Sequence, residues 1–465
     1  MFLVLAAVMS IAMPGMATAQ DAPANSTSGG SGPERVDLPA LTRLAVHSPR
    51  AQMARHATRA AEARVGEVTG AIYPKFEITA QALPTPDIAC DNADCTRTDP
   101  DNGLTGFSGI AGAARVEAIQ PLYGFGRSGP ILRAARAAAR ATSFLENAVA
   151  GDLAVEAARA YYGLKLAREL AWMLEGGLED IDKALTTIDE LIEEGDGEAT
   201  LQDRLRVATL QAEIQARLSE ARQAEAIALA GIRALSGKDT VDIDQEPLEP
   251  VALTLAPVDD YVTRAGTERP EIQAARAGAE AAHAKRKFES AGHLPVLYLF
   301  ADYQLSSATG INDPPSLFAQ DPYNHHFFQA GITLRWKVDF FTTRARVAQA
   351  RAQAHQADAL VALARDATGF DVRKTHAEAA QARARMEAAE KGEKTARAWV
   401  ASVLQATAIG TIESKEVADA LIAHFTLRAR YMTSVYEWNV ATVRLRRAVG
   451  NLGADEPTIA ADSKK

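Results

Sequence analysis

Few side chains in this sequence are spaced for chemistry, and the two cysteines are the first candidates. Cys90 and Cys95 are the only cysteines in the chain, and they lie in a polar segment. Disulfides persist in exported proteins, so we expect a local Cys90–Cys95 disulfide, with two free thiols as the alternative. No histidine lies close by in the sequence, which argues against a metal site at this pair.

Other short motifs do not complete a catalytic or cofactor site. Gly124-Phe125-Gly126 lacks the longer glycine spacing of a phosphate loop. His325-His326 could bind a metal, but neighbouring histidines in a polar loop are more often solvated. Glu193-Glu194 lies in a helical charge pattern that is typical of a solvated surface. The sequence therefore predicts no enzyme activity, no cofactor and no metal.

The charge balance and the first residues bear on location. The chain has 465 residues and a net charge of -9, which argues against nucleic acid as a partner. Residues 1–19 are uncharged and largely apolar, and they end in Ala17-Thr18-Ala19. This pattern predicts a cleaved signal peptide, although no Lys or Arg precedes the apolar core as it does in most such signals. No other segment approaches the ~20 apolar residues of a membrane helix, so we expect an exported protein.

An internal repeat organises the chain. Pro49 and Pro74 are 25 residues apart, as are Pro270 and Pro295, and each pair encloses an Ala/Arg/Glu-rich segment. Each half then continues with two alternating stretches, a long helical run, a Gly-containing turn and a last helix. The predicted organisation is a signal peptide (1–19), a flexible leader (20–37), a first repeat (38–236), a connector (237–258), a second repeat (259–453) and a tail (454–465).

The alternating stretches predict membrane strands. In Lys75 to Leu83 one parity carries apolar residues and the other carries Lys75, Glu77, Thr79 and Gln81, and in Phe327 to Val338 an apolar parity alternates with one that carries Arg335 and Lys337. The stretches 109–120 and 294–305 show a weaker pattern. Period two over about 10 residues is typical of a barrel strand between lipid and a wet lumen. A half-exposed strand of a soluble sheet is the alternative.

The helical runs are too long for a compact domain. Residues 127–193 have no proline after Pro130, and at 1.5 Å per residue such a helix spans about 100 Å. Apolar residues recur at alternating spacings of three and four, which is a coiled-coil pattern. They are Leu178, Ile181, Leu185, Ile188 and Ile192. Four strands cannot close a membrane barrel alone, because open edges in lipid leave backbone groups unpaired. We therefore expect several copies to share one barrel.

Three segments resemble the TolC family of outer-membrane efflux proteins. The segment "QPLYGFGR" at 120–127 is similar to the family's strand-to-helix junction. The segment "AIGTIESKEVADALIA" at 408–423 is similar to its second periplasmic turn, and "GEATLQDRLRVATLQAE" at 197–213 to its first. The junction "WKVDFFTTR" departs from the pattern because it lacks Pro and Gly. We expect Pro74, Pro121 and Pro295 to mark the junctions between strands and helices.

The resemblance implies a fold, partners and a gate. The fold is an α+β membrane protein: a long α-helical coiled-coil barrel and a transmembrane β-barrel, shared by a homotrimer with four strands per protomer. The implied partners are outer-membrane lipid, a periplasmic adaptor and an inner-membrane transporter. Glu416 and Asp419 align with the family's acidic gate positions, and Gln202 and Asp203 with polar partners of the gate. The family's basic tether position falls on Ile412, so that part of the closing network is not matched.

Two other functions remain as alternatives at this point. A periplasmic adaptor also has a long helical hairpin, but it would show one hairpin between two halves of a soluble β-domain. A helical scaffold would not explain the signal or the alternating strands. Within the channel class, the sequence does not separate drug or metal efflux from protein secretion. The carboxylates Glu416 and Asp419 could also be a solvated helix face.

Overall fold

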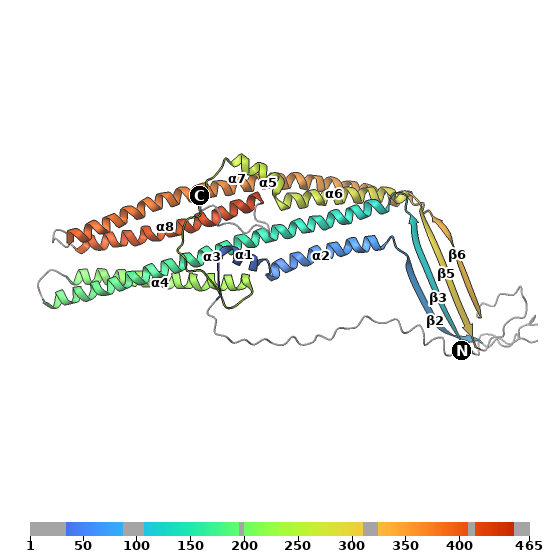
Figure 1. The fold of residues 1–465 in the computed structure, drawn as a ribbon, viewed down its shortest axis with the longest axis horizontal. Coiled ribbons are helices and arrows are strands. Elements are labelled where there is room, and N and C mark those ends of the chain that lie inside the picture. Colours follow the sequence, from blue (N-terminus) through green and yellow to red (C-terminus); the bar gives the residue numbers. More distant parts are fainter. Residues whose placement is uncertain (1–33, 87–106, 195–199, 310–323, 408–413, 451–465) are drawn as a thin grey trace, which may run out of the picture.

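The computed structural model describes residues 34–86, 107–194, 200–309, 324–407 and 414–450. Figure 1 shows an elongated molecule with a sheet at one end and two long helical hairpins that reach the other. In chain order the elements are β1 (Glu34–Val36), α1 (Leu38–Ala45), α2 (Pro49–Gly70), β2 (Lys75–Pro86), β3 (Phe107–Tyr123), α3 (Ser128–Glu194), α4 (Leu201–Ser236), β4 (Val241–Ile243), α5 (Val258–Glu268), α6 (Pro270–Ser290), the 3-10 turn η1 (Ala291–His293), β5 (Val296–Ala308), β6 (His325–Arg335), α7 (Phe340–Thr407) and α8 (Ser414–Val449).

Some predictions lie outside the described residues. They are the signal peptide over 1–19, the tail over 454–465, the Cys90–Cys95 disulfide and the residue Ile412. These remain predictions.

The two halves of the chain repeat one plan, as the proline spacing predicted. The order α1-α2-β2-β3-α3-α4 recurs as α5-α6-β5-β6-α7-α8. The long helices α3 and α7 have 67 and 68 residues, and α4 and α8 have 36 each. Both α2 and α6 begin with proline, whose fixed backbone angle suits the first helical position. The short helices α1 and α5, which the sequence did not predict, complete the duplication.

Helices and strands follow the same order across the molecule. The sheet order is β2-β3-β5-β6, antiparallel throughout. In the helical layer, α3 packs against α2 and α6, and α6 packs against α7. The strand order β2-β3-β5-β6 therefore matches the helix order α2-α3-α6-α7, and each strand is joined to the helix at the same place in the order. Within the described chain, β2 and β6 each have one free edge.

All four alternating stretches are strands, with shifted ends. The first extends to Pro86, and the second covers 107–123. The third begins at Val296 because η1 precedes it, and it runs to Ala308. The fourth ends at Arg335, so residues 336–338 leave the sheet before α7 begins.

The best-packed part of the molecule is its middle, which we call the waist: β1, α1, β4 and the connector packed on α3, α4 and α8. Leu41, Leu164, Ile232 and Ile243 are fully buried there. The prediction of a flexible leader over 20–37 is wrong for its last residues, because the strand Glu34–Val36 pairs in parallel with Val241–Ile243. Asp37 then caps α1 by accepting a hydrogen bond from the backbone N–H of Ala40 at 2.8 Å.

The coiled-coil stripe of α3 packs mainly against α4 in the first hairpin. Ile181 is buried and Leu178 and Leu185 are half-buried, in a cluster that also holds Ile214 and Leu218 of α4. Towards the end of the hairpin the stripe opens, and Ile192 is 37% exposed. Among the residues that the structure describes, no helix is both long and apolar enough to cross a membrane.

Candidate functional site

One face of the four-stranded sheet is apolar from edge to edge. The register places Ile78 opposite Val116, Val116 opposite Tyr303, and Tyr303 opposite Phe328. These four side chains lie in one row, because residues directly opposite each other in a sheet share a face. Large apolar side chains on this face are exposed, Phe76, Ile78, Phe328 and Ile332 by 65–72%. A soluble protein rarely exposes an apolar face of this extent.

The opposite face carries the charges of the sheet. Glu77 lies opposite Glu117, and Glu117 opposite Asp302. Asp302 is buried and accepts a hydrogen bond from Nε of Arg115 at 2.6 Å. The sheet thus separates an apolar side from a charged one, which is the arrangement of strands between lipid and a wet lumen.

Aromatic residues gather where the strands meet the helices. Their side chains are exposed by 38–91%, so they are not core residues of the single chain. They are Tyr73, Tyr123, Phe125, Phe340 and Phe341. Such a belt suits the boundary between lipid and water.

The prolines predicted at the junctions differ in position. Pro74 lies between α2 and β2, and Pro295 between η1 and β5. Pro121 lies inside β3, where the register with β5 shifts between Pro121 and Tyr123. The turn into α3 comes later, at Phe125 and Gly126, which both have positive φ. The Gly-Phe-Gly segment is therefore a tight turn.

A buried polar clamp fastens the connector to α8 at the waist. The side chain of Asn439 is fully buried, and its Oδ1 accepts a hydrogen bond from the N–H of Val251 at 2.8 Å. Its Nδ2 donates to the carbonyl of Glu249 at 2.8 Å. The neighbouring Trp438 donates from Nε1 to the carbonyl of Val251 at 2.9 Å. One amide side chain thus satisfies a backbone donor and a backbone acceptor of the same segment.

An ion network ties the two repeats together near this clamp. Arg447 of α8 bonds Asp152 of α3 at 3.0 Å and Glu271 of α6 at 2.7 Å. Arg269 bonds Asp371 of α7 at 2.7 Å. Burial alone would raise the pKa of Glu271, but the hydrogen bond and charge of Arg447 outweigh it, and the pKa is lowered.

The predicted gate residues lie near the hairpin ends opposite the sheet (Figure 1). Glu416 and Asp419 stand in the first two turns of α8, and both are exposed. Gln202 is exposed in the first turn of α4. The gating role of these residues remains a prediction.

Asp203 has a local partner that the sequence analysis missed. It forms a capping box with Thr200: the N–H of Thr200 donates to its carboxylate at 3.1 Å, and its own N–H donates to Oγ1 of Thr200 at 3.2 Å. The hydrogen bonds from Thr200 lower the pKa of Asp203. The spacing of Thr200 and Asp203 is itself the sequence signature of a helix start and could have identified this cap.

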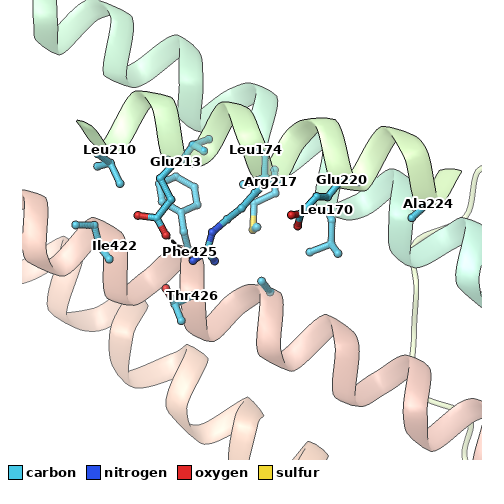
Figure 2. Close-up of a pocket in the computed structure, with 14 residues that line it drawn as sticks. Leu170, Leu174, Leu210, Glu213, Arg217, Glu220, Ala224, Ile422, Phe425 and Thr426 are labelled. Atoms are coloured by element: carbon cyan, nitrogen blue, oxygen red, sulfur yellow. Dashed lines mark hydrogen bonds and ion pairs between the residues drawn. The ribbon is translucent and has the colours of Figure 1, made fainter. Parts of the chain in front are cut away.

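A cavity of about 330 Å³ lies between the two hairpins, between the waist and the hairpin ends that lie opposite the sheet. Leu170 and Leu174 of α3, Leu210 of α4 and Phe425 of α8 contribute its apolar walls, and Arg217 bonds Glu213 at its rim (Figure 2). The first hairpin therefore meets α8 loosely along this stretch.

The histidine pair gives no metal site in the described part of the chain. His325 and His326 start β6 and point to opposite faces, since adjacent strand residues do. Over the described ranges, no group of three or more His, Cys, Asp or Glu side chains could hold a metal ion.

The family comparison matches the second repeat. Residues 262–451 match the family model described as outer membrane efflux protein. The chain is also 30% identical over 274 residues to protein CyaE of Bordetella pertussis. That match covers 57% of this chain and 55% of CyaE, so it spans only about half the length of that relative.

Several solved channels share the fold. The open-state outer membrane channel MtrE of Neisseria gonorrhoeae has a TM-score of 0.70 and 16% identity over 90% of both chains. VceC, an outer membrane protein of Vibrio cholerae, has a TM-score of 0.69 and 17% identity, over 89% of this chain and 96% of its own. The outer membrane channel CmeC of Campylobacter jejuni has a TM-score of 0.70 and 14% identity, over 90% of this chain and 87% of its own.

Proposed function

We propose, since residues 262–451 carry an outer membrane efflux protein domain on a TolC-like channel fold, that this chain is one protomer of a homotrimeric exit duct. The duct works with a periplasmic adaptor and an inner-membrane transporter. The TolC-like resemblance of the sequence motifs is confirmed by the family match and the shared fold.

The family also accounts for location and chemical class. It is a family of outer-membrane channels, so the sheet lies in the cell outer membrane and the helices lie in the periplasm. The family is not enzymatic, which agrees with the prediction from the motifs. The two hairpins and the single membrane-type sheet disfavour the adaptor and scaffold alternatives, which would lack them.

The observation that carries the proposal is the two-faced sheet with two free edges. An edge strand in lipid leaves its N–H and C=O groups without partners, at several kcal/mol each. The free edges of β2 and β6 lie at opposite sides of the sheet, and α2 and α7 end the helical layer in the same order. Joining β6 of one copy to β2 of the next is a head-to-tail contact, which gives a closed ring when the rotation between copies closes; a barrel in lipid requires that closure.

The first test is the size and conductance of the assembly. Native mass measurement in mild detergent should give a trimer, and the purified protein should form stable pores in a planar bilayer. A monomer in mild detergent, or trimers that never conduct, would count against the proposal.

The second test concerns the mouth. Three copies of Glu416 and Asp419 bring six carboxylates to one constriction, and rings of acidic side chains favour cations. Glu416→Ala with Asp419→Ala should reduce the cation preference and weaken block by trivalent cations. The control is Glu387→Ala with Glu390→Ala on α7, which changes the net charge by the same amount. These two residues lie roughly 25 Å or more along the helix from Thr407, the last residue of α7. Equal behaviour of the two pairs would leave Glu416 and Asp419 as a solvated face.

The cargo depends on the partner. A proton-driven pump would deliver drugs or metal ions, and an ATP-driven exporter would deliver protein. Co-purification of the crosslinked inner-membrane partner from native cells separates these two classes.

A further inference from the structure

Two glycines of α3 face aromatic side chains of α8, and the two contacts differ in tightness. A Cβ built on Gly163 would lie 3.8 Å from Cε2 of Tyr436, which is ordinary contact. A Cβ built on Gly177 would lie 3.0 Å from Cζ of Phe425 and 3.3 Å from Cε1. Only at Gly177 would an added methyl group press on the ring, which would have to shift by a few tenths of an ångström.

The ring of Phe425 has close packing on one side and open space on the other. It packs with the buried cluster of α3 and α4 that holds Leu174 and Ile214, and it also lines the 330 Å³ cavity. Figure 2 shows the ring projecting from α8 towards the first hairpin beside this cavity. A small push from α3 can therefore move the ring into free volume.

The contact lies close to the predicted mouth. Phe425 follows Asp419 by six residues and Glu416 by nine, which corresponds to about 9 and 14 Å along a helix. Among the described residues, α8 makes little direct contact with α4 and meets the first hairpin mainly through α3. The position of the first turns of α8 relative to the first hairpin thus depends on how α8 is seated here.

We propose that Phe425, seated on Gly177, is a positioning residue that holds the mouth end of α8 against the first hairpin. It sets the geometry of the carboxylates without touching the cargo. This inference rests on the proposed channel function and on the mouth assignment of Glu416 and Asp419. Helices α7 and α8 pack closely on each other, and Gly392 of α7 lies beside Leu427 of α8, so we expect the second hairpin to move as a unit.

The test compares Gly177→Ala with Gly163→Ala. Both substitutions remove a helix-interior glycine from α3 and gain the same helix propensity, but only Gly177→Ala pushes on an aromatic ring. Gly177→Ala and Phe425→Ala should each weaken trivalent-cation block about fivefold, the change expected from a coupling of about 1 kcal/mol. Gly163→Ala should leave block unchanged. Gly177→Ala with Phe425→Leu should recover part of the loss, because the smaller side chain makes room for the methyl group.

A distance measurement separates failure of this inference from failure of the channel proposal. Spin labels at Leu205→Cys on α4 and Glu416→Cys on α8, in a Cys90→Ser, Cys95→Ser chain, report the separation of the two hairpins without any current. The distance distribution should shift or broaden with Gly177→Ala and not with Gly163→Ala. Unchanged distances and unchanged block in intact trimers overturn the inference. If Gly177→Ala shifts the distance but trivalent cations do not block even the wild-type channel, the positioning role of Phe425 is supported and the assignment of Glu416 and Asp419 to the mouth is rejected.

Discussion

The waist and the mouth are built from the same helices but are held by different kinds of contact. At the waist, the buried amide of Asn439 bonds the connector, and the buried guanidinium of Arg447 bonds α3 and α6. Towards the mouth, Glu416 and Asp419 are exposed, and the hairpins meet around a cavity. Stability should therefore concentrate at the waist and conformational freedom at the mouth.

This contrast explains why the same side-chain type has different roles in the two regions. A carboxylate at the waist, such as Glu271, completes an ion pair within the chain. Glu416 and Asp419, in the first turns of α8, are exposed in the single chain, and we propose that they face ions at the mouth. Four variants, taken from the largest expected loss of stability to the smallest, test this difference between the waist and the mouth.

The largest loss is expected from Asn439→Ala. This substitution leaves the N–H of Val251 and the carbonyl of Glu249 without the Asn439 side chain in a part-buried segment, which costs up to about 1–3 kcal/mol for each group. The trimer should melt at a clearly lower temperature in a detergent-based thermal scan. Glu437→Ala, two residues away, removes an exposed ion pair with Arg385 and should cost less than about 1 kcal/mol. Similar losses in both variants would mean that the clamp does not fix the waist.

The second loss is expected from Glu271→Gln and depends on pH. The folded-state pKa of Glu271 lies below its ordinary value of 4.5. Its stabilising contribution is therefore present above pH 4.5 and is lost as the pH falls through the folded-state pKa. At pH 7 the variant should lose about 2 kcal/mol, less than for a fully buried pair because one-third of the carboxylate is exposed. The difference in melting temperature between wild type and variant should become smaller below pH 4.5. A difference that does not change with pH would mean that the Glu271 carboxylate is not the source of the lost stability.

Most helices and strands could be predicted from local patterns in the sequence. Period two located all four strands of the sheet to within a few residues, and the absence of breakers predicted α3. Pairing over long sequence distances was not predictable. The strand Glu34–Val36 pairs with residues about 200 positions away, and three residues carry no measurable periodicity. The contact of Phe425 with Gly177 depends on two helices from different repeats, so no local signal marks it.

The candidate site was predictable only in part, for a related reason. The positions of Glu416 and Asp419 near a hairpin end followed from a motif, because the turn is local. The bonding of Asp203 did not follow from the family alignment, because capping depends on where α4 begins. The clamp of Asn439 was also missed, since an Asn within a helix gives no sign of which backbone groups it will bond.

The third effect is smaller and lies at the end of the first hairpin. Thr200→Ala removes the side-chain cap of α4 and should cost about 1 kcal/mol locally. Because the hairpin end lies far from the waist, the melting temperature of the trimer should barely change. Amide hydrogen exchange in residues 201–206 should instead become faster. Thr200→Ser, which keeps the hydroxyl group, is the control, and equal exchange in the two variants would refute the capping role.

The smallest effect on stability is expected at the residues with the largest proposed effect on conduction. Glu416 and Asp419 are exposed in the single chain, and substitutions at exposed sites change stability by roughly 0.5 kcal/mol or less. Glu416→Ala with Asp419→Ala should therefore leave the melting temperature within error of wild type. Six crowded carboxylates repel each other, so the variant trimer could even melt slightly higher at low salt, where screening is weak. A marked loss of stability would mean that these side chains bond a neighbouring copy, and any change in conductance would then report damage to the assembly. Melting curves at low and high salt, measured on the preparation used for the bilayer experiment, decide between the two origins.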